Sequence, residues 1–202
     1  MKKYIFTAVF ITSVILISCV RSLYPLTDNE DESIFKKELL GRWLGPDSTQ
    51  YIVDTVPGKS GKLYKIVLID VTNNVEIIGF SDTSYFVASL VDVNGRFFLD
   101  CSTEMEKFEN KTLGESAINL LVPTHFIIRL DSMNDRSIGI ASLDEDAFSE
   151  LLKTKKFSIR HQEINEDDFL LTESPGQLQR KLKDLERFPS VFHRAILTRM
   201  KE

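Results

Sequence analysis

The sequence predicts a mainly β domain with helices near its C-terminus, built as an antiparallel, meander-like barrel or a strongly bent sheet. Three observations support this fold class. Apolar and polar residues alternate from residue 51 to residue 143 with the period of two that is typical of strands. Turn-forming pairs such as Asn94-Gly95 and Asn134-Asp135 separate the alternating segments. Helical spacing of apolar residues is found mainly after residue 144.

Length and composition indicate one ordinary folded domain. The chain has 202 residues, a net charge of −5 and only two cysteines. Such a length is enough for one domain with a sizeable core. The acidic balance argues against nucleic acid or an anionic lipid surface as the main partner. We expect an N-terminal signal at 1–18, an acidic tether at 19–33 and a single β-rich domain at 34–202.

The N-terminus has the layout of a secretory signal peptide. Lys2 and Lys3 precede an uncharged, apolar segment at 4–17. This segment is short for a membrane span, which needs about 20 apolar residues. An uncleaved anchor helix is the alternative interpretation, and it also holds the protein at a membrane.

The end of the signal, Leu16-Ile17-Ser18-Cys19, resembles the lipobox of bacterial lipoproteins. Residues 19–26 also resemble the start of uncharacterised envelope lipoproteins. The resemblance implies that Cys19 carries the lipid and becomes the first residue of the mature protein. It implies a membrane-anchored protein of the cell envelope, with the outer membrane as the expected location. Cys101 is then left as a lone thiol, so no structural disulfide is expected.

The segment after Cys19 is expected to be a solvated tether. Residues 28–32 form an acidic run, which is typical of a linker in water. The alternative is a surface-export signal, although the run starts later than such signals usually do. Residues 34–40 can form one or two helical turns, and Gly41 can end them.

Seven strands are predicted between residues 51 and 143. Their ranges are 51–56, 63–71, 75–80, 84–93, 96–101, 126–133 and 136–143. A two-residue turn at Asn94-Gly95 pairs Val93 with Arg96 and places Cys101 opposite Ala88. One face of this hairpin is then apolar, whereas the other carries Asp100 and faces solvent.

The segment 63–71 is apolar on both faces, which is unusual for a strand that is covered on one side only. A turn at Asn73-Asn74 can pair it with 75–80, and the C-terminal helices are the expected cover of its outer face. Residues 102–123 are too apolar for a free loop and are expected to form a partly helical flap.

Beyond residue 143 the sequence predicts three helices and two closing strands. Asp144 is a suitable N-cap for a helix that ends near residue 153. The closing strands are expected at 157–162 and 168–172. Ser174 and Gln177 suit a capping box around Pro175, and a final helix is expected at 191–200.

Gly41-Arg42-Trp43, just before the first strand, resembles the Gly-x-Trp start of lipocalin-like proteins. The resemblance implies an eight-stranded barrel in which Trp43 is a structural plug at one end. It also implies a cup for a small apolar molecule, lined by Phe86, Phe97 and Phe126. The competing interpretation is that these phenylalanines simply fill the core, as side chains do in many small barrels.

No motif of a catalytic or metal site is found, and no cofactor is expected. The three histidines, His125, His161 and His193, are too widely spaced for the usual zinc patterns. Cys101 and His125 are expected on opposite faces of the sheet. We therefore expect a non-catalytic binding module for a small hydrophobic or lipid-like ligand. The alternative is a structural or accessory lipoprotein that acts through protein contacts in the envelope.

Overall fold

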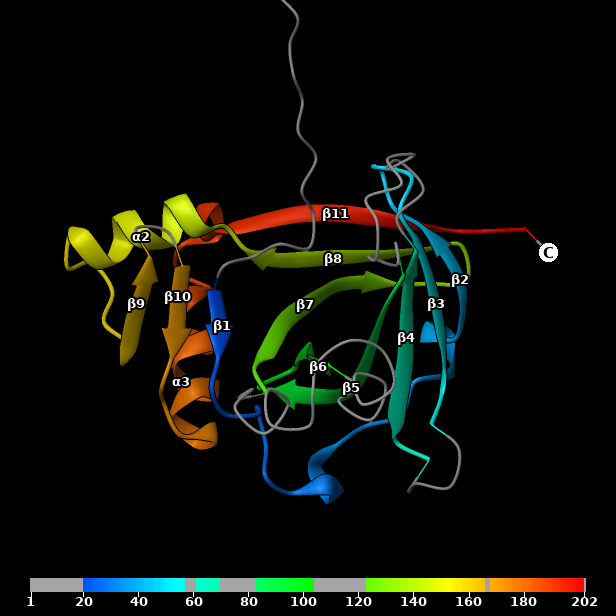
Figure 1. Cartoon of the computed structure of the whole chain (residues 1–202), viewed down its shortest axis with the longest axis horizontal. Helices are drawn as coiled ribbons and strands as arrows, with labels where there is room; N and C mark the ends of the chain where they lie inside the picture. Colours follow the sequence, from blue (N-terminus) through cyan, green and yellow to red (C-terminus); the bar gives the residue numbers. More distant parts are fainter. Residues whose placement is uncertain (1–19, 57–60, 70–82, 104–122, 166–167, 202) are drawn as a thin grey trace, which may run out of the picture.

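A computed structural model describes residues 20–56, 61–69, 83–103, 123–165 and 168–201, and eight of the strands in these ranges close into an antiparallel barrel (Figure 1). The barrel strands are β2 (Gly41–Leu44), β3 (Gln50–Thr55), β4 (Leu63–Ile69), β5 (Thr83–Val93), β6 (Arg96–Thr103), β7 (His125–Met133), β8 (Ser137–Leu143) and β11 (Phe192–Arg199). Each strand pairs with the next in this order, and β11 pairs with β2 to complete the circle. The predicted fold class is confirmed, and the architecture is consistent with a lipocalin-like barrel.

A second group of elements lies beside the barrel, at the left of Figure 1. It consists of α2 (Glu145–Lys153), β9 (His161–Asn165), β10 (Asp168–Leu171), α3 (Pro175–Leu185) and the 3-10 turn η4 (Pro189–Val191). The chain forms this group between β8 and β11. A short N-terminal strand, β1 (Val20–Ser22), joins it to the barrel because β1 pairs with both β10 and β7.

Two apolar cores follow from this arrangement. The first lies inside the barrel and contains residues such as Trp43, Tyr64, Leu90 and Leu99. The second lies between the outer face of the barrel and the added helices. It is formed by Val20, Leu26, Val91, Val93, Phe98, Ala141, Leu143, Phe148, Phe157, Ile159, Phe169, Leu171, Leu178, Leu182, Leu185, Val191 and Phe192.

The β5–β6 hairpin has the predicted turn and register. Asn94 and Gly95 have φ angles of 55° and 83°, as a turn with two left-handed residues requires. Val93 pairs with Arg96. The expected solvent face was wrong, however, because Asp100 is buried there with 4% of its surface exposed. The second core covers this face of the hairpin, and its other residues come from segments far away in the sequence.

Residues 20–33 are not the solvated linker that the acidic composition predicts. They form a strap that begins with β1 and continues around the barrel to the 3-10 turn η1 (Glu30–Glu32). Leu26 is completely buried, and Ser33 forms a β-bridge with Val91. The strap continues into a second 3-10 turn, η2 (Lys37–Leu39), at the position expected for helical turns.

The final helix expected at 191–200 is wrong, since residues Phe192–Arg199 form β11. Ala195 and Leu197 point into the barrel, while Ile196 between them is 64% exposed. The apolar residues fit a helical period as well as a period of two. Pairing with β8 and β2, which closes the barrel, decides between them.

The pairing proposed for 63–71 with 75–80 is also wrong, because both edges of β4 are taken by β3 and β5. Val67 pairs with Ile52 on one side and with Tyr85 on the other. Residues 75–80 lie outside the described residues. The described helices pack in the second core and not over β4, so they are not the cover expected for its outer face.

The local predictions for α2 and α3 have different outcomes. The Asp144 carboxylate accepts a hydrogen bond from the Ala147 N–H at 2.9 Å, which confirms the cap of α2. The Ser174 side chain makes no capping hydrogen bond, so the capping box is wrong. Gln177 instead accepts a hydrogen bond from Arg160. The closing strand β9 starts at His161, later than expected.

Candidate functional site

The barrel encloses an apolar cavity of about 100 Å³. Its lining residues come from all eight barrel strands and from η2, and none of them is charged. They are Leu39, Trp43, Tyr51, Val53, Ile66, Leu68, Phe86, Leu99, Cys101, Phe126, Ile128, Leu130, Ile138, Ile140 and Leu197. A wall of this composition suits a hydrocarbon and disfavours a charged group, which is costly to bury without a partner.

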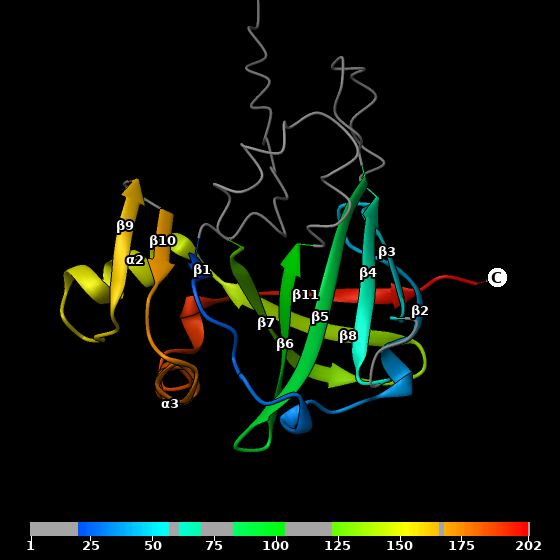
Figure 2. The ribbon, with the colours of Figure 1, turned by 60° about the horizontal axis from the view of Figure 1, so that its bottom comes forward.

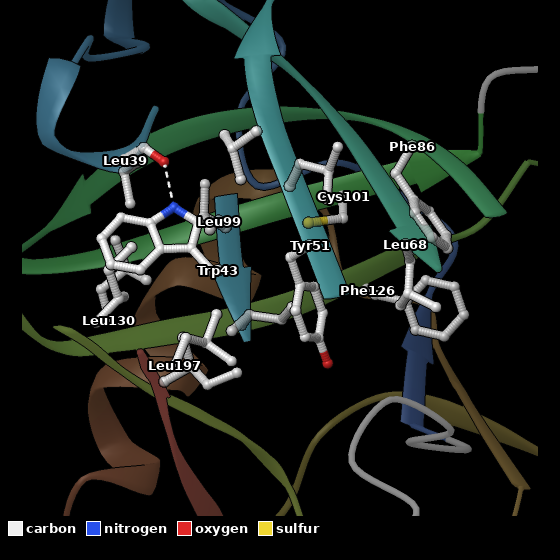
Figure 3. Close-up of a pocket in the computed structure, with 15 residues that line it drawn as sticks. Leu39, Trp43, Tyr51, Leu68, Phe86, Leu99, Cys101, Phe126, Leu130 and Leu197 are labelled. Carbon is white, nitrogen blue, oxygen red and sulfur yellow. Dashed lines mark hydrogen bonds between the residues drawn. The ribbon is translucent and has the colours of Figure 1, made fainter. Parts of the chain in front are cut away.

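Trp43 and Leu39 form one end of the cavity, at the left of Figure 3. Trp43 is fully buried, and its Nε1–H donates a hydrogen bond of 2.9 Å to the Leu39 carbonyl. The strap covers the same end. Its Ile34 N–H donates to the Leu90 carbonyl at 2.8 Å, and its Lys36 N–H donates to the Tyr64 hydroxyl at 2.6 Å. The structure thus places Trp43 at the end of the barrel that the strap closes.

Arg199 reinforces this closed end and was not recognised in the sequence. Its guanidinium carbon lies 4.1 Å from the centre of the Trp43 ring. Its N–H groups donate to the carbonyls of Asp135, Leu40 and Glu38 at 2.6, 2.9 and 3.0 Å. If residues 192–199 had been assigned to a strand, its period of two would have placed Arg199 on the inward face, together with Ala195 and Leu197.

Gly41 is required by the same contact. Its φ angle is +125°, and a Cβ atom there would lie 2.5 Å from Nη1 of Arg199. A residue with a side chain would therefore strain the backbone and displace the guanidinium group from Trp43. This gives a physical reason for the glycine in Gly41-Arg42-Trp43.

Phe86, Phe126 and Leu68 form the other end of the cavity, at the right of Figure 3. The rings of Phe86 and Phe126 meet edge to face with their centres 6.4 Å apart. We call the adjacent strand ends the upper rim. The upper rim consists of Leu44 and Gln50, Ile69 and Thr83, and Thr103 and His125.

Phe97 was expected to line the same cavity and does not. It lies near the Asn94-Gly95 turn, opposite Asp92, and the Lys36 ammonium group is 5.2 Å from the centre of its ring. The register placed Phe97 on the correct face. Its position along the strand, at the closed end, separates it from Phe86 and Phe126.

Cys101 points into the cavity and is 5% exposed. Burial, with a smaller contribution from the charge of Asp100, raises the pKa of its thiol far above the ordinary range. The thiol is thus a weak nucleophile in the folded protein. His125 pairs with Asp100 on the outer face, so Cys101 and His125 lie on opposite faces as expected.

A buried polar cluster beside the upper rim holds the strap. Nδ1 of His125 lies 2.7 Å from one carboxylate oxygen of Asp100. The other oxygen accepts a hydrogen bond of 2.7 Å from the Leu26 N–H. Both oxygens of the buried Asp100 carboxylate are thereby occupied by contacts that fix His125 and the strap, so the cluster suits a structural role.

A second polar cluster, around Arg129, was also missed by the sequence analysis. Arg129 is 4% exposed and forms ion pairs with Asp131 at 2.6 Å and Glu186 at 2.8 Å. Burial alone would lower its pKa, but the two carboxylates raise it overall. Its guanidinium carbon lies 3.9 Å from the centre of the Phe192 ring. The cluster ties β7 to the end of α3 and to β11, and no alternation pattern marks such an arginine as buried.

Some expected features lie outside the described residues. These are the signal at 1–18, the lipid-attachment residue Cys19 and most of the flap expected at 102–123. Within the described ranges, no group of three or more His, Cys, Asp or Glu side chains is placed to hold a metal ion. No helix among the described elements has the length and apolar character needed to cross a membrane.

The chain was compared with protein-family models, curated proteins and solved structures, and none of them matches.

Proposed function

We propose that this is a lipid-anchored protein of the cell envelope whose barrel binds a small hydrophobic or lipid-like ligand without catalysis. The single observation that carries the proposal is the uncharged lining of a cavity inside a closed barrel. The lipobox-like sequence that ends at Cys19 supports the anchor.

The volume of the cavity limits the ligand to a narrow molecule. An apolar protein cavity of about 150 Å³ can hold benzene, whereas sites for drug-sized ligands usually exceed about 300 Å³. The space of about 100 Å³ therefore suits part of a single hydrocarbon chain better than a fused ring system. A charged end of such a ligand would remain outside the apolar lining, at the upper rim, where water can solvate it.

A variant that fills the cavity tests ligand binding. Val53 lines the cavity, and Ile52 precedes it on the outer face of β3. We expect saturable binding of a fluorescent polyene fatty acid to the wild-type protein. Val53→Phe should weaken this binding at least about tenfold, which corresponds to about 1.4 kcal/mol. Ile52→Phe adds the same side chain outside the barrel and should leave affinity within about twofold.

Circular dichroism must show that both variants are folded, since overpacking alone destabilises by about 1–3 kcal/mol. Absence of saturable binding to the wild-type protein would refute the ligand-binding proposal. An equal loss of affinity in the two variants would show that the fatty acid binds elsewhere.

The anchor is tested independently by Cys19→Ser. Lipid attachment needs a thiolate, which serine does not provide. We expect Cys19→Ser to fold normally, to lack acyl mass and to leave the membrane fraction. Acylated Cys19→Ser protein would refute lipid attachment at this residue.

A second candidate function, a structural or accessory role, has one observation in its favour. Ile52, Val67 and Tyr85 pair directly across the outer faces of β3, β4 and β5, and Tyr85 is 37% exposed. Such a row suits contact with another protein. Cross-linking in intact envelopes tests this role, and recovery of the monomer alone would argue against it.

A further inference from the structure

The distance between the proposed lipid and the folded domain is fixed by where β1 begins. Val20 is the first residue of β1 and follows Cys19 directly in the sequence. Adjacent Cα atoms are about 3.8 Å apart, so there is no linker between the acylated residue and the domain. A lipoprotein domain on a long tether can take any orientation, but a domain attached in this way cannot.

Several contacts hold β1 firmly. Val20 is 5% exposed within the second core. Arg21 forms an ion pair of 2.6 Å with Asp168, and the Leu23 N–H donates to the Leu171 carbonyl at 2.9 Å. Leu26 is also buried, and its N–H is bonded to Asp100. Residues 20–26 therefore cannot extend into a spacer without unfolding the strap.

The short strand β1 lies beside the upper rim. Its last residue, Ser22, pairs with His125, which belongs to the upper rim, so Val20 is only two residues from the level of the rim. Val20 pairs with Phe169 in a parallel register, so the start of β1 lies beside the start of β10. Figure 2 shows the end of β9 and the ends of β4 and β6 pointing to the top of the view, with β1 between β10 and β7 in the upper part.

The exposed residues on this side suit a lipid surface without strong negative charge. Large apolar side chains that are well exposed include Ile164, near the β9–β10 turn, at 50%, and Leu44 and Tyr85, at or near the upper rim, at 38% and 37%. Glu163 adds negative charge beside them, whereas the charge of Asp168 is paired with Arg21. Apolar groups favour contact with the bilayer interface, whereas acidic groups disfavour anionic lipids.

We propose that acylation of Cys19 holds the domain with its upper rim facing the bilayer, so that the cavity exchanges a hydrocarbon chain with membrane lipids. This inference rests on the lipid attachment and the binding cavity proposed above. It adds an orientation, a contact surface at the upper rim and Ile164, and a source for the ligand. The strap-covered end near Trp43 then faces away from the membrane.

Depth-dependent quenching tests the orientation. The purified acylated protein is placed in phosphatidylcholine vesicles that contain a spin-labelled lipid. A fluorophore is attached to Ile164→Cys or to Arg96→Cys, which follows the Asn94-Gly95 turn at the strap-covered end. The parent protein, whose Cys101 thiol is buried, is the control for labelling. We expect quenching of the fluorophore at position 164 to be at least about twice that at position 96.

A matched variant separates orientation from anchoring. Eight Gly and Ser residues inserted between Cys19 and Val20 can span about 27 Å when extended. The insertion should leave acylation intact and reduce quenching at position 164 to the level at position 96. Mass spectrometry confirms the acyl groups in every sample.

Each outcome assigns a failure to one proposal. Equal quenching at both positions in acylated protein, or stronger quenching at position 96, would overturn the orientation and leave the anchor in place. Wild-type protein without acyl mass would overturn both the anchor and the orientation. Loss of fatty-acid binding in Val53→Phe is measured in solution, so it depends on neither the anchor nor the orientation.

Discussion

Arg199 shows how one side chain can stabilise an entire end of the barrel. Its guanidinium group covers Trp43 and donates hydrogen bonds to carbonyls of η2, the residue after it and the β7–β8 turn. Charge-assisted hydrogen bonds contribute about 1.5–3 kcal/mol each, although such contributions are not additive. A lysine keeps the charge but lacks the planar group that serves the ring and three carbonyls together.

We therefore expect Arg199→Lys to lower the free energy of unfolding by about 1–3 kcal/mol in urea titrations. Arg194→Lys is the matched control on the same strand. Arg194 is 58% exposed and forms one ion pair with Asp131, so its replacement should cost less than about 0.5 kcal/mol. Equal effects of the two substitutions would contradict the special role of Arg199.

Glu173 gives the domain a pH-dependent contribution to stability. It is 5% exposed, and its two carboxylate oxygens accept hydrogen bonds of 3.0 Å from the backbone N–H and Nε of Arg160. Burial by itself would raise its pKa, but the bonds from Arg160 and the nearby charge of Lys181 lower it overall. Ionised Glu173 therefore stabilises the fold above the usual glutamate pKa of about 4.3.

This stabilisation is lost as the pH falls through the lowered pKa of the folded state. We expect wild-type protein to be more stable than Glu173→Gln at pH 7 and at pH 5, by the same margin. The margin should shrink as the pH falls below about 4. Urea titrations at each pH measure it, and a margin that grows with acidification would contradict the assignment.

At the scale of elements, the strap is the largest departure from the sequence-based expectation. An acidic run normally indicates a solvated linker, and the side chains of Asp28, Asp31 and Glu32 are indeed exposed. The strap is nevertheless fixed by the apolar residues on either side of this run, Leu26 before it and Leu39 after it. Their partners lie in distant strands and helices, which local composition does not reveal.

Leu26→Ala should lower the free energy of unfolding by about 2–5 kcal/mol, as is typical for a fully buried leucine. Tyr24→Ala is the control in the same segment. Tyr24 is 44% exposed, so its truncation should change stability by less than about 0.5 kcal/mol. If Leu26→Ala were as stable as Tyr24→Ala, the strap would not belong to the cooperative fold.

Elements with strong local signals were predictable from the sequence. The β5–β6 register depends on Asn94-Gly95, and the start of α2 depends on Asp144. The elements between β8 and β11 were harder to assign. The apolar residues of Phe192–Arg199 fit the helical period as well as the strand period of two. Only pairing with the open edges of β8 and β2 makes this segment a strand.

At the scale of the whole molecule, the sequence was sufficient for the barrel but only in part for the cavity. Phe86 and Phe126 line it as expected because alternation places them inside. Alternation gives the face of a strand but not the height along it, which explains the misplaced Phe97. The polar clusters around Asp100 and Arg129 depend on long-range packing, so no local pattern indicates them.

The position of β1 also determines the order in which the molecule can be completed. Its parallel partner β10 lies near the other end of the chain, and β2 likewise needs β11. Contacts between such distant segments form late and slowly, because a long loop must first be closed. During synthesis, the residues of β1 emerge long before their partners. The segment Val20–Ser22 therefore joins the sheet only after nearly the whole chain has followed.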